Sequence, residues 1–549
     1  MKYVFVIGST CSGLGKGVTS SSIGALLQRL GHHVTCLKID PYLNIDAGTM
    51  SPYEHGEVFV TDDGGETDLD LGNYERFLDI NLTKQHNLTT GKVYMSVLER
   101  ERRGVPEYLG KTIQVIPHVT DTIQEWIKRT AHLPLESKTP TVCMVELGGT
   151  VGDVESSVYL EAIRQFIWSA GKENCFVVNV CLIPTISPNT EDSEPKTKPA
   201  QHAVVALRSA GITPDVLVCR STKPLCATTT AKLAKSCMVP PEAVIGVHDV
   251  TNIYNVPLLL RQTGVPELIH RHFKLPFPAA PPGLLDWEGF AAQIDFASPE
   301  VRIAIVGKYT GLRDSYLSVT NALTHAAIHH GCSVRVVWLD SEQDKLVAKL
   351  QEAKVHGVLV PGGFGIRGIA GMLTATQWAR EAHIPWFGIC LGMQVGVIEW
   401  ARNVAGYSPE IGSEEFAVEE RKEEQQVIVF MPEGDKHVHG GTMRLGSRAT
   451  RLAPGTLASA VYGGAEMVHE RHRHRYEVNP TMIDRLEKSG LRFSGKDAET
   501  GSRMEICEQH KGSFLLGVQF HPEFKSRPFR PSPPFAAFVN AALCFTRNN

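Results

Sequence analysis

The stretch Tyr3-Val-Phe-Val-Ile7 is an apolar strand that enters the glycine loop Gly8-Ser-Thr-Cys-Ser-Gly-Leu-Gly-Lys-Gly-Val-Thr19. A helical pattern follows over 18–30, where apolar residues recur at helical spacing. The segment Val301-Arg-Ile-Ala-Ile-Val306 leads into Gly307-Lys308 in the same manner. Strands that alternate with helices in this way predict parallel sheets covered by helices on both faces, which is an α/β fold.

The remaining patterns extend this alternation over two parts of the chain. In the first part, strands are expected at 34–39, 141–145, 176–183, 215–219 and 243–247. In the second part, strands are expected at 334–339, 357–360, 386–389 and 514–518, with helices near 315–330 and 369–382. Between the parts, Leu275–Gly283 holds four prolines, which continue neither a helix nor a central strand. We therefore predict two doubly wound domains, at 1–275 and 300–549, joined by a linker at 276–299.

The composition is that of a folded protein with little net charge. Of the 549 residues 42% are apolar and 21% charged, and the formal net charge is −4, which argues against binding nucleic acid through bulk charge. No apolar run reaches the ~18–20 residues of a membrane helix, and no signal-peptide pattern follows Lys2. The 12 cysteines include no CxxC pair, so we expect reduced thiols and a cytoplasmic location.

The loop from Gly8 to Thr19 predicts a phosphate site. Glycines let backbone N–H groups surround a phosphate, the following helix adds positive potential at its N-terminus, and Lys16 reaches terminal phosphates as a point charge. Gly17 follows the lysine where the Walker A motif has Ser or Thr. An ordinary strand-to-helix turn is the alternative, but the lysine and the place after the first strand favour phosphate binding.

Two acidic features fit a metal-bound nucleotide beside this loop. Asp62–Asp70 holds five carboxylates in nine residues, and Glu146 ends a predicted strand. Ligands of open α/β sheets lie at the carboxyl ends of strands, and one or two carboxylates commonly hold Mg²⁺ on a nucleotide. Alone, the acidic run would be interpreted as a solvated charged face; beside a phosphate loop, we favour a role at the nucleotide.

A cysteine elbow stands in the second part. Gly388-Ile-Cys-Leu-Gly392 places Cys390 between a strand and a helix, where the helix N-terminus favours the thiolate. Downstream, His521 can take the thiol proton and Glu523 can orient the imidazole. Backbone N–H groups of Gly363 and Leu391 can stabilise an oxyanion. We interpret the other cysteines as buried small apolar residues.

The run Arg471-His-Arg-His-Arg-Tyr476 is the last polar motif. His472 and His474 share a face if the run is a strand, but no cysteine or acidic ligand cluster accompanies them in the sequence to complete a zinc site. The near-neutral net charge disfavours RNA. We expect an arginine of this run to have a structural role or to bind a substrate carboxylate.

These residues carry a family resemblance. The set Cys390, His521 and Glu523 with Pro361-Gly-Gly-Phe364 is similar to class I, triad-type glutamine amidotransferases, and the first domain resembles the amidoligase domain of the CTP synthase family. The first domain shares with it Ser12–Gly17, Lys38–Asn44, Gly48–Pro52, His55–Val60, Glu66–Gly72, Glu146–Asp153 and Lys196–Pro199. The second domain shares Gly440–Gly446 and Arg471–Asn479. The resemblance spans Lys2 to about Phe545.

The resemblance implies a fold and a reaction. The first domain would be a P-loop domain like that of dethiobiotin synthetase, and the second a flavodoxin-like glutaminase. Glutamine is hydrolysed at Cys390, ATP with Mg²⁺ phosphorylates O4 of UTP, and ammonia from an internal tunnel displaces the phosphate to give CTP. Free ammonia is an alternative donor. This is the last step of de novo pyrimidine nucleotide synthesis.

The resemblance also implies the binding residues, by position. ATP would be bound by Gly13, Leu14, Gly15, Lys16, Gly17, Val18, Lys38, Asp70, His248, Asp249 and Val250, and Mg²⁺ by Asp70 and Glu146. UTP or CTP would be bound by Ser12, Asp153, Val154, Glu155, Lys196, Thr197, Lys198, Pro199, Ala200, Gln201 and Lys232, in part across a subunit interface. Glutamine would be bound by Gly363, Leu391, Gly392, Met393, Gln394, Glu415 and Arg475.

The implied partners are ATP, UTP and glutamine, with CTP as feedback inhibitor and GTP as activator. The family forms homotetramers, and stacking of tetramers into filaments is left open; neither a nucleic acid nor a membrane is expected as a partner. The charged segment Glu419–His439 is shorter than in some relatives, which leaves the GTP-dependent lid open.

Two other functions compete with this interpretation. A cobyrinic-acid-type amidotransferase also joins a P-loop amidoligase to a triad domain, but Lys196-Thr-Lys-Pro199 and Asp68-Leu-Asp-Leu71 disfavour it. A non-catalytic, filament-forming scaffold is the second alternative. An intact triad together with Lys16, Asp70 and Glu146 counts against a scaffold, because a scaffold need not retain these residues.

Overall fold

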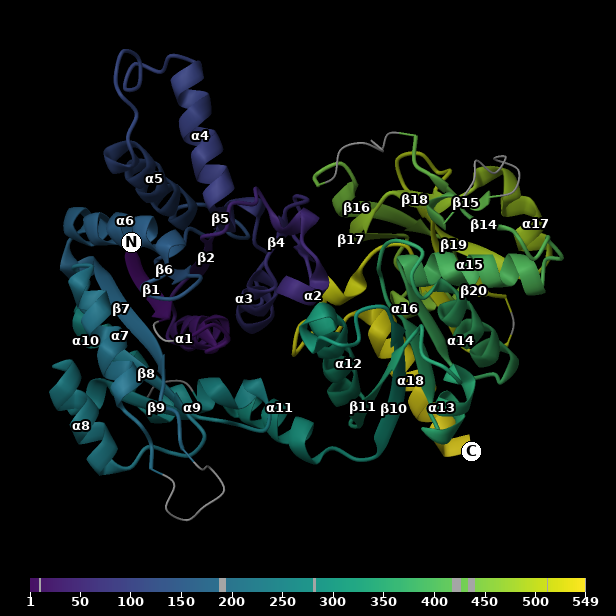
Figure 1. The fold of residues 1–549 in the computed structure, drawn as a ribbon. Helices are drawn as coiled ribbons and strands as arrows, with labels where there is room; N and C mark the ends of the chain where they lie inside the picture. Colours follow the sequence, from purple (N-terminus) through teal and green to yellow (C-terminus); the bar gives the residue numbers. More distant parts are fainter. Residues whose placement is uncertain are drawn as a thin grey trace. The chain divides into compact units, whose positions relative to one another are not determined.

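The structure is a computed structural model that describes residues 1–8, 11–186, 194–279, 283–416, 426–432, 440–510 and 512–548. The charged segment expected to bear on the lid, Glu419–His439, lies outside these residues except for 426–432. Contacts divide the chain into two compact units (Figure 1). Unit 1 is Met1–Asp46 with Asp70–Asp295, and unit 2 is Ala47–Leu69 with Phe296–Asn549.

Unit 1 is built on a seven-stranded parallel sheet in the order β5-β2-β6-β1-β7-β8-β9. Its strands are β1 (Lys2–Gly8), β2 (Val34–Asp40), β5 (Asn87–Thr89), β6 (Val142–Leu147), β7 (Cys175–Leu182), β8 (Val216–Ser221) and β9 (Val244–His248). Its helices are α1 (Lys16–Arg29), α3 (Asp70–Leu78), α4 (Thr90–Arg102), α5 (Thr120–Ala131), α6 (Val154–Ala170), α7 (Lys198–Ser209), α8 (Ala227–Cys237), α9 (Val256–Gln262), α10 (Val265–Phe273) and α11 (Leu285–Phe296).

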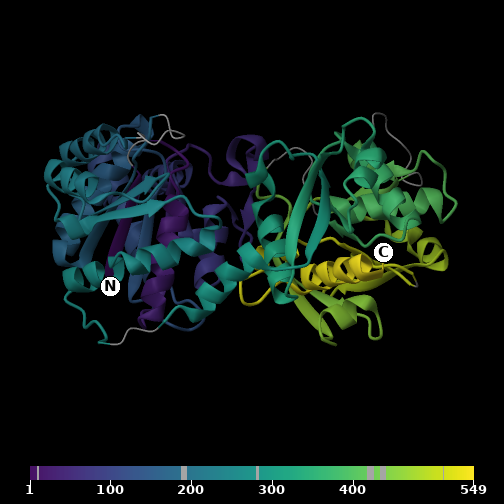
Figure 2. The same ribbon diagram turned by 90° about the horizontal axis from the view of Figure 1, so that it is seen from below.

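Both faces of this sheet are covered, as the strand patterns predict (Figure 2). Alternate residues Tyr3, Phe5 and Ile7 of β1 join one apolar core with α5 and α6, while α1 packs against β1, β2 and β6. Strands buried on both faces read as continuous apolar runs, which is why the sequence pattern located β1, β2, β6, β7, β8 and β9 to within two residues, whereas the three-residue strand β5 was not predicted. Because the strands are parallel, their carboxyl ends share one edge.

The stretch predicted as a linker contains helix α11. The four prolines of Leu275–Gly283 all lie before residue 283. The residues that follow them can form a helix, and some of their apolar side chains are buried. Trp287 and Phe290 are buried, with ring centroids 5.8 Å and 5.0 Å from that of Tyr254. This part of the chain therefore packs on unit 1. The domain boundaries at 275 and 300 stay a prediction.

Unit 2 has a nine-stranded mixed sheet in the order β11-β10-β12-β13-β21-β20-β19-β16-β17. Its strands are β10 (Glu300–Gly307), β11 (Ser333–Asp340), β12 (Gly357–Val360), β13 (Trp386–Ile389), β16 (Arg444–Leu452), β17 (Met467–His474), β19 (Leu491–Asp497), β20 (Met504–Gln509) and β21 (Leu515–Val518). The smaller strands are β3 (Phe59–Val60), β4 (Glu66–Thr67), β14 (Gly412–Ser413), β15 (Gln426–Phe430) and β18 (Tyr476–Val478).

The helices of unit 2 are α2 (Pro52–His55), α12 (Leu317–His329), α13 (Leu346–Glu352), α14 (Ile369–Glu381), α15 (Leu391–Asn403), α16 (Leu457–Val461), α17 (Ile483–Lys488) and α18 (Pro533–Asn548). Strands β11, β10, β12, β13 and β21 are parallel, as predicted. Strands β20, β19, β16 and β17 extend the sheet antiparallel, which the alternation of strands and helices did not predict. Short connections such as that between β19 and β20 join only antiparallel neighbours.

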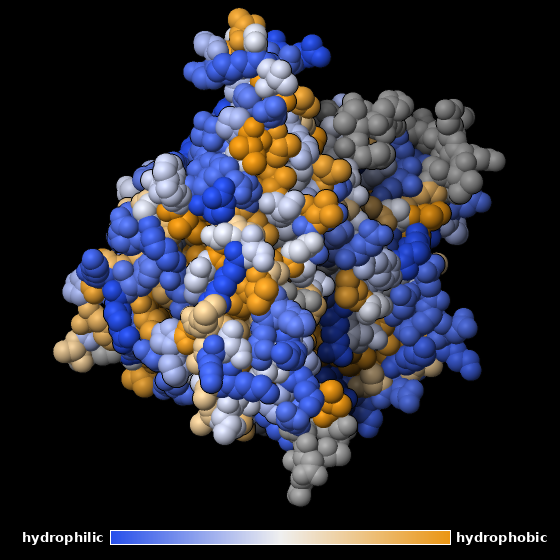
Figure 3. Space-filling model, turned by 60° about the vertical axis from the view of Figure 1, so that its left-hand side comes forward, coloured by the Kyte–Doolittle hydropathy of each residue, from blue (hydrophilic) through white to orange (hydrophobic). Residues whose placement is uncertain are grey.

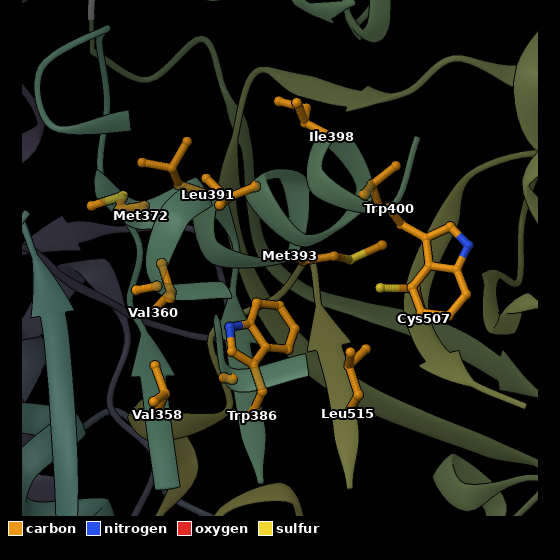
Figure 4. Close-up of a cluster of buried hydrophobic side chains, with 14 of the residues drawn as sticks. Val358, Val360, Met372, Trp386, Leu391, Met393, Ile398, Trp400, Cys507 and Leu515 are labelled. Carbon is orange, nitrogen blue, oxygen red and sulfur yellow. The ribbon is translucent and has the colours of Figure 1, made fainter. Parts of the chain in front are cut away.

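The core of unit 2 holds α15 firmly against the sheet (Figure 4). Trp386 of β13 and Leu515 of β21 point toward Met393 and Trp400 of α15, and Leu391 begins the same helix. This packing sets the direction in which the turn between β13 and α15 leaves the sheet. No helix in the described ranges is long and apolar enough to span a membrane.

Candidate active sites

The carboxyl edge of the unit 1 sheet gathers the predicted phosphate site. Lys38 of β2 lies beside three carboxylates: it contacts Asp70, and its Nζ is 3.4 Å from Asp40 and 3.6 Å from Glu146. Lys16, at the start of α1, donates to the carbonyl of Gly149 at 2.8 Å. Two lysines therefore lie among three buried or half-buried carboxylates at the end of the phosphate loop.

The pKa values of the ionisable side chains at this site are shifted from their ordinary values. Burial, followed by repulsion from Asp70, raises the pKa of Glu146 to about 7. Burial alone would raise the pKa of Asp70, but the Lys38 ammonium outweighs it and holds that pKa below its usual value. Burial lowers the pKa of Lys16, and the nearby Glu146 offsets only part of this effect. Carboxylates crowded in this way favour a bound cation.

Gly17 explains why the loop departs from the Walker A motif. A Cβ atom at this position would lie 2.1 Å from a carboxylate oxygen of Asp70. Serine or threonine therefore does not fit between the loop and Asp70.

The predicted adenine residues connect to the loop through a residue that the sequence analysis missed. Arg220, at the end of β8, donates to the Gly13 carbonyl at 2.9 Å and lies 3.2 Å from Asp249. His248 ends β9, and Asp249 and Val250 follow it. The place of Arg220 at the end of a predicted strand was the signal available in the sequence.

The predicted UTP and CTP residues form two groups around β1. Asp153, Val154 and Glu155 begin α6 after β6, and the Asp153 carboxylate accepts the Thr150 N–H at 2.8 Å. Lys196 to Gln201 lie at the start of α7 after β7, and Lys232 lies on the neighbouring α8. Lys196 pairs with Glu194 at 2.6 Å. Ser12 is exposed in the phosphate loop itself.

Unit 2 places the triad as predicted at the elbow. Cys390 lies between β13 and α15 with φ 53° and ψ −104°, a strained conformation for a residue with a side chain. Nδ1 of His521 lies 2.7 Å from the Glu523 carboxylate. Burial would lower the pKa of His521, but Glu523 and the Cys390 sulfur outweigh it and raise that pKa to about 10. This arrangement favours the protonated imidazolium of His521 beside Glu523 and the Cys390 sulfur.

Glycines allow the close approach that this geometry needs. A Cβ atom at Gly392 would lie 1.9 Å from the Val360 carbonyl oxygen, and one at Gly362 would lie 2.8 Å from Cε1 of His521. The loop that carries Gly362 and Gly363 rests on Lys308, whose ammonium donates to the Phe364 carbonyl at 3.0 Å. Lys308 is fully buried, and burial lowers its pKa to about 8.

A cavity of about 880 Å³ opens over the triad. It is lined by Cys390, His521 and Glu523, and by the predicted glutamine residues Gly363, Glu415 and Arg475. The Glu415 carboxylate accepts the Gly365 N–H at 2.7 Å, and burial raises the Glu415 pKa. The side chains of Leu391 and Met393 face the core instead, so these two residues offer a ligand only their backbone.

The acidic run Asp62–Asp70 is divided between the units, which corrects the expectation that it acts as one cluster at the nucleotide. Of the five carboxylates, Asp70 lies at the phosphate loop, while Asp62 and Glu66 form ion pairs within unit 2. Arg471 Nε lies 2.6 Å from Asp62, and Arg473 Nε lies 2.8 Å from Glu66. These arginines have the structural role foreseen for the run at 471–476.

The histidines between these arginines lie close to an acidic side chain that the sequence did not indicate. His472, His474 and Glu505 are buried within 4.8 Å of one another. Nδ1 of His472 lies 3.1 Å from Nε2 of His474, Nδ1 of His474 lies 3.0 Å from the Tyr476 carbonyl, and Glu505 lies 3.4 Å from Arg444. We interpret this group as a hydrogen-bonded network that supports β17. The two histidines already contact each other, and Glu505 already contacts the guanidinium of Arg444.

Together, the two units and their sites define a class of protein: a class I glutamine amidotransferase joined to a nucleotide-binding α/β domain. The model of the CTP synthase N-terminus matches residues 2–275, and the class-I glutamine amidotransferase model matches residues 312–541. CTP synthase from Dictyostelium discoideum is 50% identical, with 99% of both chains covered, and human CTP synthase 1 is 48% identical, with 99% of this chain and 93% of its own covered. The chain belongs to the CTP synthase family.

Among solved structures, the glutaminase domain of Trypanosoma brucei CTPS with bound acivicin is similar to part of the chain. It is 39% identical and covers 44% of this chain and 94% of its own, with a TM-score of 0.41.

Proposed function

We propose that the chain carries out its family's reaction at the two sites described above. The reaction is the ATP-dependent amination of UTP to CTP with ammonia released from glutamine. The observation that carries the assignment of residues is the placement of Cys390, at a strained elbow, in one cavity with His521 paired to Glu523. A change in absorbance as UTP is converted to CTP, with glutamine as donor, tests it. A scaffold or a cobyrinic-acid-type enzyme would produce no CTP.

At the glutaminase site, the residues have separate roles. Sγ of Cys390 attacks the side-chain amide carbon of glutamine, and His521 carries the proton from the thiol to the leaving ammonia. Glu523 holds the imidazole through Nδ1, and backbone N–H groups of Gly363 and Leu391 stabilise the oxyanion. Glu415 and Arg475 complement the amino and carboxylate groups of glutamine, and water then hydrolyses the thioester.

At the synthase site, the phosphate loop and Lys16 hold the ATP phosphates, and Lys38 neutralises the transferred group. The donor set of Asp70 and Glu146 fits Mg²⁺, because hard carboxylate oxygens are crowded there at a site that favours a cation. Bound Mg²⁺ would neutralise charge on the ATP phosphates. His248, Asp249 and Val250 would lie beside adenine.

Removing either carboxylate tests the proposed metal site. Asp70→Asn and Glu146→Gln each remove an anionic oxygen ligand with little change of shape. We expect each variant to raise the Mg²⁺ concentration for half-maximal CTP synthesis by roughly tenfold or more, while basal glutaminase activity is retained. A magnesium titration with ammonia as donor measures the effect. Glu161→Gln is the control, because Glu161 is a half-buried carboxylate on α6 that pairs with Arg164. Unchanged magnesium dependence in both site variants would rule out the ligand assignment.

UTP and CTP carry the same triphosphate but differ at position 4 of the base. Lys196, Lys198 and Lys232, which lie on or near α7 and α8, would therefore hold the triphosphate of both, with Ser12 and residues 197–201. One base pocket cannot hydrogen-bond a carbonyl oxygen and an amino group equally well. We propose that Asp153, Val154 and Glu155 serve CTP, the feedback inhibitor.

The split site predicts different effects for two variants. Glu155→Ala should weaken CTP inhibition by about fivefold or more while UTP half-saturation changes little, because an acceptor for the cytosine or ribose donors is lost. Lys198→Ala should weaken both, because a phosphate partner is lost. The measurements are the CTP inhibition constant and the UTP half-saturation of each variant. Equal losses for both nucleotides in Glu155→Ala would contradict the split site.

We extend the proposal to assembly and location. Helix α4 carries exposed apolar residues, among them Met95 at 44% and Leu98 at 61% of full exposure, and apolar side chains gather where this helix stands (Figure 3). Such a surface suits self-association into the family's homotetramer, with GTP as activator. All 12 cysteines are free thiols, which suits the reducing cytoplasm.

A further inference from the structure

Gln519 lies beside Cys390 and is not among the residues expected to form the triad or to bind glutamine. It follows β21 and precedes Phe520 and His521, and it is 1% exposed. Its side chain lies between two others: Nε2 of Gln394 donates to its Oε1 at 3.2 Å, and its own Nε2 donates to Sγ of Cys390 at 3.7 Å. Its backbone N–H donates to the Glu505 carbonyl at 2.8 Å, which holds the residue in place.

The direction of these hydrogen bonds is set by a backbone carbonyl. Nε2 of Gln394 also lies 3.1 Å from the carbonyl oxygen of Tyr476. That oxygen only accepts, so the nitrogen of the Gln394 amide must face it. The same nitrogen also donates to Gln519, so the atom of the Gln519 amide that faces it must be the oxygen, Oε1. The amide nitrogen of Gln519 is then the atom that faces the sulfur of Cys390. The backbone of β18 thus determines that Cys390 faces a donor.

The sulfur of Cys390 has a second polar neighbour, which is a hydrogen-bond acceptor and not a donor. The thiol lies 3.6 Å from the carbonyl oxygen of Arg473, which accepts a proton but offers none. The thiol form of Cys390 can donate there, whereas the thiolate gains from the N–H of Gln519, since donors to an anion form the stronger hydrogen bonds. The two neighbours therefore favour different protonation states of one sulfur.

We propose that Gln519 is a positioning residue of the glutaminase, which orients the sulfur of Cys390 and stabilises its thiolate through an amide whose direction Gln394 sets. This inference rests on the proposed role of Cys390 as the nucleophile and deepens it. Gln394 is among the residues expected to bind glutamine, so the same side chain would contact substrate and orient the group that activates the nucleophile. The reaction steps are unchanged, and Gln519 gives up no proton.

Two variants of the full chain test the proposal. Gln519→Met keeps the length of the side chain without the N–H donor, and Gln519→Glu replaces the donor with an acceptor. Their kcat and KM for glutamine hydrolysis are measured, together with the rate at which iodoacetamide alkylates Cys390 across pH, followed peptide by peptide. The exposed Cys226 serves as internal reference in the same samples. Gln377→Met, on α14, is the matched control.

We expect Gln519→Met to lower kcat by about tenfold or more with KM nearly unchanged, and Gln519→Glu to lower it further. In both, half-maximal alkylation of Cys390 should move to higher pH, by about one unit for a tenfold loss of thiolate, while Cys226 and the control variant stay unchanged. Thermal unfolding of each variant, followed by circular dichroism, reports whether unit 2 is folded, and the isosteric Gln519→Glu carries the test if Gln519→Met fails to fold.

Two results would overturn the proposal. An unchanged kcat in both variants would remove any role for Gln519, and a lowered kcat with an unchanged alkylation profile would reduce it to packing. Failure of the proposed function is a separate result, because it would appear as glutamine hydrolysis that survives the loss of Cys390 itself.

Discussion

Replacing Cys390 with alanine is expected to lower glutamine-dependent CTP formation by more than about 1000-fold, while synthesis from free ammonia continues. The reason is that the described structure places Cys390 at the elbow of β13 and α15, beside the paired His521 and Glu523, whereas the synthase residues lie in unit 1. CTP formation is measured with each donor in turn, at saturating ATP and UTP.

Cys332→Ala is the matched control for this variant. Cys332 is a buried cysteine of the same unit that packs in the core and contacts the Ala327 carbonyl. Its loss should reduce stability modestly, by about 1 kcal/mol, and leave both activities in place. If Cys390→Ala lost ammonia-driven synthesis to the same degree as glutamine-driven synthesis, the model of two separate sites would be wrong.

Lys16→Ala is expected to produce the opposite pattern. It should lower CTP formation from either donor by more than about 100-fold and leave basal glutamine hydrolysis in place. Lys16 begins α1 at the phosphate loop, and its ammonium lies at the Gly149 carbonyl near the carboxylates of Asp70 and Glu146. Without it, the phosphates of ATP would meet those carboxylates with one compensating charge fewer.

The measurement is ammonia-dependent CTP synthesis and glutaminase activity on the same preparation. Lys172→Ala is the control, because Lys172 is a half-exposed lysine of unit 1 that pairs with Asp215 at 2.7 Å away from the loop. Ammonia-dependent synthesis that persists in Lys16→Ala would exclude this lysine from the phosphate site. Together, the variants Lys16→Ala and Cys390→Ala would assign CTP synthesis to unit 1 and glutamine hydrolysis to unit 2.

The parts of the site that the sequence predicted are those built from short stretches of chain. The elbow at Cys390 needs only the residues from Gly388 to Gly392, and the phosphate loop needs only those from Gly8 to Thr19. Local patterns of this kind carry their own geometry, because glycines and a strand–helix junction restrict the backbone. The family resemblance extended this prediction to single residues.

The parts that could not be predicted depend on contacts between distant residues. Nothing near Asp62 or Glu66 indicates that their partners are Arg471 and Arg473, so the acidic run looked like one cluster. Gly17 is a second example. In the sequence it is only a departure from the Walker A motif, and the structure gives the reason, because the Asp70 carboxylate lies where a Cβ atom would be. Spacing along the chain defines the residue types at a site, but their pairing is decided by the folded sheet.

Residues Ala47–Leu69 belong to unit 2, but the ribosome makes them long before it makes the rest of that unit. Asp62 and its partner Arg471 are 409 residues apart. At ~5–20 residues per second, the ribosome needs about 20–80 s to make the chain between them. During that interval residues 47–69 have left the ribosome, while strand β17, which carries Arg471, has not been made. All of unit 1, which ends at Asp295, is therefore made before Arg471 exists, and a chaperone can meet residues 47–69 while Asp62 still lacks this partner.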